Sequence, residues 1–434
     1  MKKTLALILA AVMALSLVAC AKTPANGGTE AKGSVYYLNF KPEADQAWQD
    51  LAKTYTEQTG VEVKVVTAAS GQYDTMLTSE LDKSAPPTMF QVGNQGAVNS
   101  YGDFCYPLDN TDVMKEMTTQ DFNLKNANGE TVSIGYCYEA YGIIVNKALL
   151  KQAGYELSDI TNFETLKKVA DDIHSRAAEL GFDAFSSAGL EGSSSWRFSG
   201  HLANMPLYYE FRDDGVTEQP AEIKGTYLDN FRNIWDLYIT DSAADPTALS
   251  TATGDQSEAE FGEGKAVFYQ NGTWEYAALT ADKFNLNPDE IAMIPIYCGV
   301  DGEEKAGLCS GTENCWAINS QAKEEDIQAS LDFLYWLVTD PDASAVLVEQ
   351  LGAVPFKSCP ASANKFIVDG NALLADGKYA VTWAFNYTPN VDSWRATVVT
   401  ALAAYSADPT DANWEAVKTA FVDGWAIEYK TVNG

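Results

Sequence analysis

The chain has 434 residues, of which 60 are acidic and 29 basic, and its formal net charge is -31 at pH 7. This acidic balance argues against nucleic acid and anionic lipid head groups as partners, because both require clustered lysine and arginine. The length exceeds what a single hydrophobic core supports, so we expect two lobes.

The N-terminal segment predicts where the protein resides. A basic start is followed by the apolar run 4–18, which is too short for a membrane span. Leu17-Val18-Ala19-Cys20 resembles the lipobox of bacterial lipoproteins. The resemblance implies that residues 1–20 are a lipoprotein signal peptide and that Cys20 carries the lipid. Residues 21–33 then read as a flexible tether. We expect a protein anchored to the cell membrane on its extracytoplasmic face, in a periplasm or on a Gram-positive surface.

The remaining cysteines allow disulfides but indicate no metal site. An even number outside the membrane permits fifteen pairings, so the pattern of bridges stays open. There is no C-x-x-C motif, and the two histidines lie far apart in sequence, so we expect no zinc and no other cofactor. These cysteines are Cys105, Cys137, Cys298, Cys309, Cys315 and Cys359.

Strand and helix patterns alternate along the chain, which indicates an α/β protein. Expected strands cover residues 34–40, 61–66, 88–92, 132–138, 141–146, 266–269 and 291–297. Expected helices cover residues 42–59, 73–83, 147–154, 161–180, 227–240, 324–339, 391–406 and 412–430. The helix at 161–180 begins with a T-x-x-E pattern, which is typical of a capping box.

The stretch 261–279, F-G-E-G-K-A-V-F-Y-Q-N-G-T-W-E-Y-A-A-L, carries the most information. Its apolar strand 266–269 is followed by a turn at Asn271-Gly272. Thr273 is then positioned to cap a helix that holds Trp274 in its first turn. This order places Trp274 at the carboxyl edge of a sheet, where open α/β sheets bind ligands.

This order of residues resembles the signature of extracellular solute-binding proteins of sugar ABC importers, in the maltose-binding-like family. The run E-A-Y-G-I-I-V-N-K-A-L-L-K-Q-A-G, which starts at Glu139, resembles the first crossing strand of that family. The resemblance implies a two-lobe periplasmic-binding-protein-like fold, with a hinge of crossing strands and an interlobe cleft. Lobe one would comprise 34–140 and the return 291–350, and lobe two 141–290 and 351–434. The second and third crossings are expected at 291–297 and 351–355.

The family resemblance also implies a ligand-binding set. A sugar ring offers a C–H face that packs on aromatic planes and a rim of hydroxyls that binds polar side chains. Trp274, Trp394 and Trp196 stand at positions that resemble the stacking aromatics of lobe two, with Phe198 as an alternative to Trp196. For each of these rings, burial in the core is the competing interpretation.

Polar candidates come mainly from lobe one. Gln91, Asn94 and Glu139 resemble hydroxyl-binding positions of the family, and Tyr73 and Glu275 are further candidates. The best-known maltose binders often have an aromatic residue at the position of Gln91, so the identity of the sugar stays open. Structural roles would explain each of these polar residues equally well.

The resemblance therefore implies a substrate-binding lipoprotein that captures a neutral di- to pentasaccharide and delivers it to the transmembrane subunits of an ABC permease. We expect a monomer without catalytic activity, because G-x-S-x-G, H-E-x-x-H and Walker A motifs are absent from the sequence. A secreted carbohydrate-active enzyme remains an alternative, since two of the many carboxylates could lie at glycosidase spacing. The sequence is also compatible with a surface carbohydrate-binding adhesin, or with a binding protein for a polyamine or an iron complex.

Overall fold

The computed structural model describes residues 32–352 and 354–434, and Gly33–Gly434 form one compact unit. The expected signal peptide, the lipidation site Cys20 and most of the tether lie outside the described residues. Within the described part of the chain, no helix combines the length and the apolar character that crossing a membrane requires.

The first lobe is built on a mixed sheet whose order is β2-β1-β3-β11-β5-β4. Its strands are β1 (Ser34–Asn39), β2 (Glu62–Thr67), β3 (Met89–Gln91), β4 (Leu124–Lys125), β5 (Thr131–Gly135) and β11 (Cys315–Ile318). Strand β1 pairs in parallel with both β2 and β3, whereas β11 runs antiparallel to β3 and β5. The carboxyl ends of β1, β2 and β3 therefore meet at one edge.

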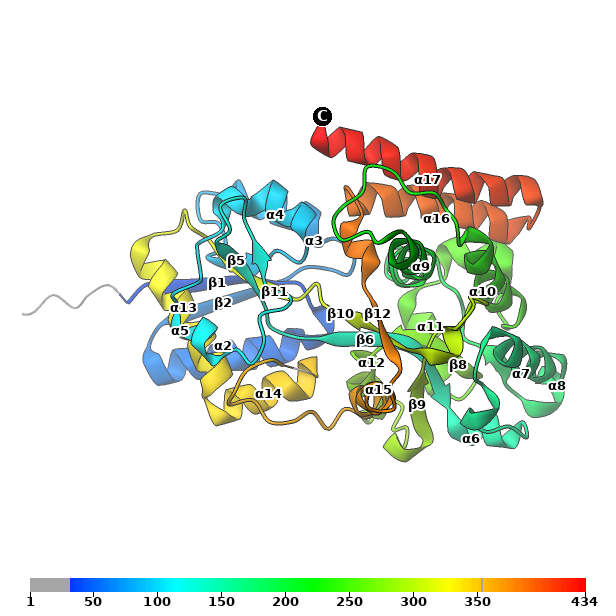
Figure 1. The fold of residues 1–434 in the computed structure, drawn as a ribbon. Coiled ribbons are helices and arrows are strands. Elements are labelled where there is room, and N and C mark those ends of the chain that lie inside the picture. Colours follow the sequence, from blue (N-terminus) through cyan, green and yellow to red (C-terminus); the bar gives the residue numbers. More distant parts are fainter. Residues whose placement is uncertain (1–31, 353) are drawn as a thin grey trace, which may run out of the picture. The chain divides into compact units, whose positions relative to one another are not determined.

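Helices cover both faces of this sheet (Figure 1). Val35 and Tyr37 of β1 pack into one core cluster and Leu38 into another, because neighbouring side chains of a strand point to opposite faces. The helices are α2 (Asp45–Thr59), α3 (Tyr73–Leu81), α4 (Gln95–Tyr101), α5 (Asp112–Glu116), α13 (Glu324–Thr339) and α14 (Pro341–Leu351). Burial on both faces explains why β1 reads as a continuous apolar run.

The second lobe contains a second sheet of order β12-β10-β6-β8-β7, with β9 also paired to β6. Its strands are β6 (Glu139–Asn146), β7 (Asp183–Phe185), β8 (Ala266–Gly272), β9 (Ile291–Ile294), β10 (Ala306–Gly311) and β12 (Tyr379–Thr382). β6 lies at the centre and runs antiparallel to β8, β9 and β10. This strand is buried along most of its length.

The helices of the second lobe pack around this sheet (Figure 1). They are α6 (Lys147–Gln152), α7 (Phe163–Ser175), α8 (Ala177–Leu180), α9 (Asn204–Asp214), α10 (Leu228–Thr240), α11 (Gly254–Gly262), α12 (Glu275–Thr280), α15 (Lys365–Ala375), α16 (Val391–Ala407) and α17 (Asp411–Asn433). Short 3-10 turns cover Pro42–Ala44, Gly102–Phe104, Leu157–Asp159, Pro246–Thr251, Pro288–Glu290, Glu303–Lys305 and Ala384–Tyr387, and Arg197–Leu202 form a π-helix.

The chain passes between the lobes in three places, and the second lies later than we expected. The first passage joins β5 to β6, and the third lies between α14 and α15. We expected the second at residues 291–297, but β9 pairs with β6 there, and the chain returns to the first sheet only between β10 and β11. An apolar run predicts a buried strand without specifying its partner. We propose lobe boundaries at these three passages.

Two local expectations also need correction. Asn271 and Gly272 do not form a turn, because β8 continues through them and pairs with β6. The Thr273 hydroxyl accepts the Ala140 backbone N–H at 3.3 Å, and α12 begins only at Glu275 without a side-chain cap. At α7 the capping box uses Asn162 and Thr165 in place of the T-x-x-E pattern, one residue further along.

The six cysteines of the described residues carry free thiols. All are buried except Cys359, which is half-buried. Burial raises the pKa of Cys105 to about 12, so this thiol stays protonated at neutral pH. Cys137 lies in the core cluster that also contains Val35 and Tyr37, where it acts as a small apolar residue.

The close approach of β9 to β6 leads to a stability prediction. A Cβ atom at Gly142 would lie 2.3 Å from the Ile294 carbonyl oxygen, so Gly142→Ala must displace the backbone of β9. We expect a loss of about 1–3 kcal/mol or more in the free energy of unfolding, measured by urea denaturation. Gly192→Ala is the matched control, because its Cβ would meet nothing within 4 Å. Equal stability of the two variants would contradict the packing described here.

Candidate functional site

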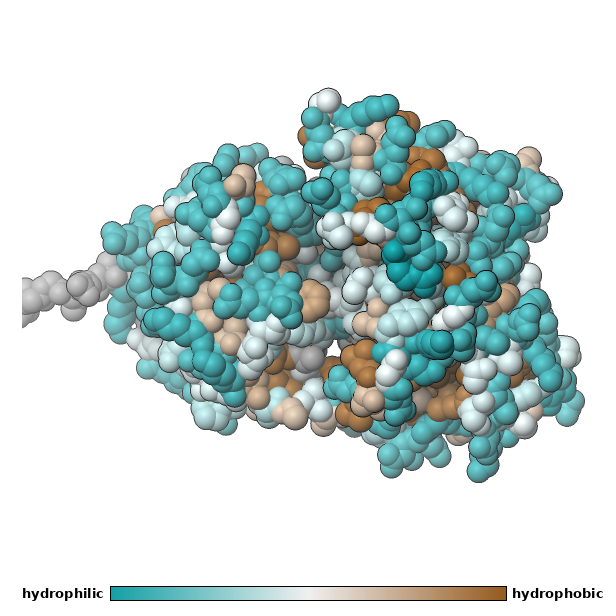
Figure 2. Space-filling model, in the orientation of Figure 1, coloured by the Kyte–Doolittle hydropathy of each residue, from teal (hydrophilic) through white to brown (hydrophobic). Residues whose placement is uncertain are grey.

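A cavity of about 520 Å³ lies between the two lobes. Figure 2 shows the surface hollowed between them. The first-lobe wall includes residues that directly follow β1, β2 and β3, which places the cavity at the carboxyl ends of these strands. The second-lobe wall comes from the π-helical segment and from α11, α12 and α16. The sequence predicted Trp274 at the carboxyl edge of a sheet, and this residue, which comes just after β8, lies in the second-lobe wall.

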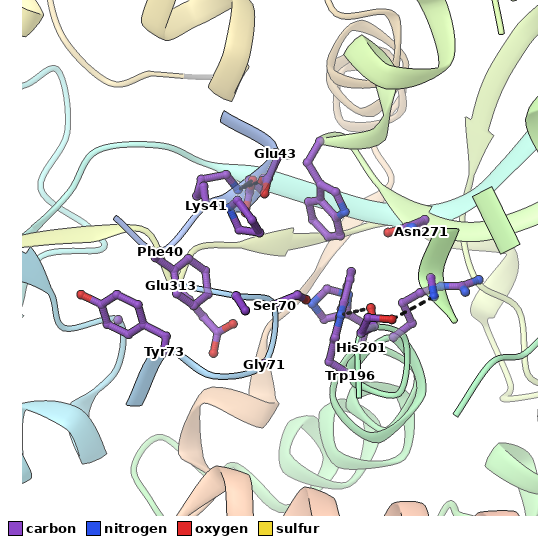
Figure 3. A pocket seen from close by; sticks show the side chains of 18 of the residues that line it. Phe40, Lys41, Glu43, Ser70, Gly71, Tyr73, Trp196, His201, Asn271 and Glu313 are labelled. Atoms are coloured by element: carbon purple, nitrogen blue, oxygen red, sulfur yellow. Dashed lines mark hydrogen bonds and ion pairs between the residues drawn. The ribbon is translucent and has the colours of Figure 1, made fainter. Parts of the chain in front are cut away.

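A buried ion pair lies where the chain first passes between the lobes. Lys41 Nζ is 2.6 Å from Glu139 Oε1 and 2.9 Å from Glu43 Oε1, and Lys41 and Glu139 are both buried. Asn314 Nδ2 donates to the second oxygen of Glu139 at 2.7 Å. Burial alone would lower the pKa of Lys41, but the charges of Glu139 and Glu43 raise it above its ordinary value. Figure 3 shows Lys41 and Glu43 side by side at the cavity wall.

The polar residues expected to bind hydroxyls all line the cavity, yet several of their polar atoms already have protein partners. The Tyr73 hydroxyl accepts the backbone N–H of Gln91 at 2.7 Å and donates to the Leu38 carbonyl at 3.2 Å. Gln91 Oε1 accepts the hydroxyl of Tyr136 at 2.8 Å. Asn94 Oδ1 caps α4 by accepting the Ala97 N–H at 2.8 Å. These residues mainly hold the cavity wall in shape.

Aromatic rings from the second lobe form the opposite wall. Trp196, Trp274 and His201 lie in mutual contact. The ring centroid of Trp196 is 5.9 Å from that of Trp274 and 5.1 Å from that of His201, and the centroids of His201 and Trp274 are 5.3 Å apart. The ring of Trp383 lies 5.7 Å from that of His201 and lines the same cavity. Trp196 Nε1 donates to the Ser193 carbonyl at 3.0 Å, which fixes its plane. We call these four residues the aromatic cluster.

Trp394 is not part of this wall, contrary to our expectation. It is 1% exposed, and its ring packs between Phe421 and Trp425 of α17. Trp394 Nε1 donates to the Phe421 carbonyl at 3.0 Å, so the indole is anchored in the core. The residues of α16 that do line the cavity are Val391, Asp392 and Arg395. Phe198, the alternative to Trp196, is likewise a core residue.

Carboxylates outnumber cations around the cavity. Among the described residues that line it, the cations are Lys41, Arg197 and Arg395. The carboxylates of the first lobe and of the passages between the lobes are Glu43, Asp74, Glu139 and Glu313, and those of the second lobe are Asp255, Glu258, Glu275 and Asp392. Elsewhere in the described chain, as here, no group of side chains has an arrangement that could hold a metal ion.

Several of these groups are electrostatically perturbed. Burial, assisted by the negative charge of Glu258, raises the pKa of Glu275 to about 8, and Asn271 Nδ2 donates to its Oε1 at 2.9 Å. Burial and the charges of Asp392 and Glu313 raise the pKa of Asp74 to about 6. Burial and the nearby arginines hold the pKa of His201 well below its ordinary value, so its imidazole is neutral. Because its pKa lies above neutral pH, Glu275 is mainly protonated there and can donate a hydrogen bond.

Sequence reasoning missed several residues of the cavity. Lys41 comes just after β1, so the argument that placed Trp274 at the carboxyl edge of a sheet would have found Lys41 too if it had been applied to β1. Arg395 and Asp392 lie close to Trp394 in sequence. Which of the three faces the cavity depends on the rotation of α16 about its axis, which the sequence does not specify. His201 gave no signal, because its role arises from three rings that converge from distant segments. Asp74 follows Tyr73 directly and was overlooked.

Comparison with known proteins agrees with this architecture. Residues 50–375 match the model of a family described as bacterial extracellular solute-binding protein. A curated relative, the erythritol/L-threitol-binding protein of Mycolicibacterium smegmatis, is 24% identical over 327 residues. That alignment covers 68% of this chain and 65% of the relative, so the chain spans about two thirds of the length of the curated relative it matches.

Solved structures of similar fold cover nearly the whole chain. The substrate-binding protein RafE in complex with raffinose, a protein of Streptococcus pneumoniae, has a TM-score of 0.72 at 16% identity, over 92% of this chain and 99% of that one. The GacH receptor of Streptomyces glaucescens has a TM-score of 0.66 at 18% identity, over 92% of this chain and 99% of that one. These likenesses confirm the two-lobe fold that the sequence predicted.

The buried pair at the first passage predicts an asymmetric response to mutation. Lys41→Met leaves Glu139 charged and without its cation, so we expect a loss of about 3–5 kcal/mol in the free energy of unfolding. Adding Glu139→Gln removes the stranded charge and should recover part of this loss. Lys53→Met, in an exposed pair with Glu57, is the control and should change stability by less than about 1 kcal/mol. Urea denaturation measures all three, and a Lys41 variant as mild as the control would contradict the account.

The raised pKa of Glu275 predicts a pH-dependent stability. Between its ordinary pKa of 4.5 and its folded pKa of about 8, the folded state holds a proton that the unfolded chain has lost. Stability contributed by this proton is therefore complete below pH 4.5 and is lost as the pH rises toward 8. Glu275→Gln stays neutral, so its unfolding free energy relative to the parent should rise between pH 5 and pH 8.

Urea denaturation at the two pH values measures this difference. Glu290→Gln, on the exposed surface of the second lobe, is the control and should show no such change. A Glu275→Gln difference that is the same at both pH values would show that Glu275 titrates normally.

Proposed function

The chain belongs to the bacterial extracellular solute-binding protein family, and from this premise we propose that it captures an oligosaccharide between its lobes and delivers it to the permease of an ABC importer. The observation that carries the proposal is the aromatic cluster, which faces charged and polar groups of the first lobe across one cavity. Aromatic planes pack against the C–H faces of sugar rings, and polar groups bind the hydroxyl rim.

Ring stacking favours a cyclic sugar over a linear polyol. The curated relative is named for erythritol and L-threitol, which are linear and offer no flat face. RafE and GacH, which share the fold, were solved with raffinose and acarbose, carbohydrates of more than one ring. A cavity of about 520 Å³ lies within the range of small-molecule sites and has room for such a ligand.

We propose the same division of the site between the lobes that the sequence suggested. Aromatic platforms belong to the second lobe, through Trp274 and Trp196, and charged groups near the first passage belong to the first lobe. Glu139 is held by Lys41 and Asn314, so its role would be to fix the wall and to present an oxygen to the ligand. We also propose that the protein acts as a monomer anchored through Cys20, and that it does not hydrolyse its ligand.

Removing one aromatic platform tests the proposal. Trp274→Ala should weaken carbohydrate binding thirtyfold or more, which is roughly 2 kcal/mol, because large aromatic anchors dominate small binding sites. The measurement is calorimetry on a panel of malto-, xylo-, manno-, galacto- and fructo-oligosaccharides, supported by melting temperature and tryptophan fluorescence. Gly272→Ala is a second variant. Its Cβ would lie 2.1 Å from the Trp274 ring, so it should displace the platform while keeping the indole.

Trp336→Ala is the matched control, because this half-buried indole lies on α13 and does not line the cavity. It should lose fluorescence but keep the affinity of the parent protein. If no carbohydrate in the panel binds the parent, the proposed function is wrong. Release of shorter sugars on prolonged incubation would instead indicate a glycosidase, for which Glu275 with its raised pKa would be the candidate acid.

A further inference from the structure

Three carboxylates that line the cavity influence one another electrostatically. Asp74 comes from α3 of the first lobe, Glu313 from the passage between β10 and β11, and Asp392 from the first turn of α16 in the second lobe. We call these three residues the acidic group. Each of them lines the cavity, and Figure 3 shows Glu313 on its wall together with Tyr73 and Gly71. The group therefore joins both lobes at the place where a ligand would lie.

The cations of the cavity do not balance this group. Lys41 is held by Glu139 and Glu43, at 2.6 and 2.9 Å. Arg197 donates to the Gln270 carbonyl at 2.9 Å and to Ser194 Oγ at 3.1 Å. Arg395 is the cation with the strongest influence on Asp74 and Glu313. Three carboxylates thus share one arginine, which leaves an excess of negative charge inside a partly desolvated cavity.

A second feature of the cavity is a pair of largely buried rings in its wall. Trp383 and His201 are 7% and 6% exposed, and both line the cavity. Trp383 Nε1 and His201 Nδ1 have no hydrogen-bond partner among the described residues. Buried polar atoms normally have partners, and one left without a partner is costly. Both nitrogens are themselves shielded from solvent, so these rings offer a ligand in the cavity their faces rather than these nitrogens.

We propose that the ligand is an amino sugar, whose protonated amine is bound by Asp74, Glu313 and Asp392 while its ring lies against the aromatic cluster. The inference rests on the proposed function, since it names the class of carbohydrate that the same cavity takes. It departs from the neutral ligand that we expected from the sequence. An ammonium group donates three hydrogen bonds, one for each carboxylate, and it cancels charge that hydroxyl groups would leave uncompensated.

The acidic group predicts that binding releases protons. Burial and its acidic neighbours Asp392 and Glu313 raise the pKa of Asp74 to about 6, against the opposing influence of Arg395. Burial also raises the pKa of Glu313, which faces Arg395, Asp392, Glu139 and Lys41. A bound ammonium favours the ionised form of both carboxyls and so lowers these pKa values. Near pH 6 an amino sugar should therefore expel protons, whereas a neutral sugar should not.

Matched pairs of sugars test the proposal directly. The probes are glucose, galactose and mannose with their 2-amino counterparts, and β-1,4-linked dimers of glucose and of glucosamine. Calorimetry at pH 6, in two buffers of different ionisation enthalpy, gives both affinity and proton release. We expect at least one amino sugar to bind about tenfold or more tightly than its neutral counterpart and to release protons.

Variants assign the effect to the acidic group. Glu313→Gln and Asp392→Asn should each reduce the preference for the amino sugar, because the amide keeps the shape but loses the charge. Glu57→Gln, on an exposed face of α2, is the matched control and should keep the full preference. The melting temperature of each variant shows whether it is folded, and proton release by the parent protein tests the idea without any substitution.

The possible outcomes separate this inference from the proposed function. If neutral sugars bind as tightly as their amino counterparts and no protons are released, the amino-sugar inference is overturned and carbohydrate binding stands. If neither kind of sugar binds, both are overturned. If putrescine, a diamine without a ring, binds more tightly than every amino sugar, the acidic group binds cations but the carbohydrate assignment fails, and both proposals are again overturned.

Discussion

Lys41 and Glu139 form a buried ion pair where the chain first passes from one lobe to the other. Lys41 lies just beyond the end of β1 and Glu139 begins β6, so the pair joins the two sheets. A buried charge cannot move far from its partner without being left desolvated, and the Asn314 amide holds the second carboxylate oxygen in place. The ion pair therefore fixes the first-lobe wall of the cavity, and the aromatic rings of the second lobe face that wall.

The two walls contribute different chemistry. Amide and hydroxyl groups of the first lobe, such as those of Gln91 and Tyr73, are largely occupied in bonds that shape the wall. Carboxylates and aromatic rings are the groups left to meet a ligand. This division explains why burial and mutual repulsion raise the pKa values of Asp74 and Glu275. These carboxyl groups lie where water alone does not stabilise their ionised forms well.

The sequence predicted the architecture more fully than the site. Trp274 and Trp394 look alike in sequence, since each stands near the start of a helix beside charged residues. Trp274 follows β8 at the sheet edge, whereas Trp394 lies on the face of α16 that packs against α17, and only tertiary contacts decide between these faces. The prediction that residues 291–297 cross between the lobes was wrong for a related reason, because an apolar run does not specify which strand it pairs with. Residues that converge from distant segments, such as His201, leave no local pattern at all.

Hydrogen exchange of the backbone amides tests most directly whether the cavity between the lobes binds the ligand. The protein would be compared with and without the carbohydrate that binds it most tightly in calorimetry. The account predicts added protection in both walls at once, in residues 39–43 and 69–74 of the first lobe and residues 193–201 and 272–278 of the second. Protection confined to one lobe, or to segments away from the cavity, would contradict it.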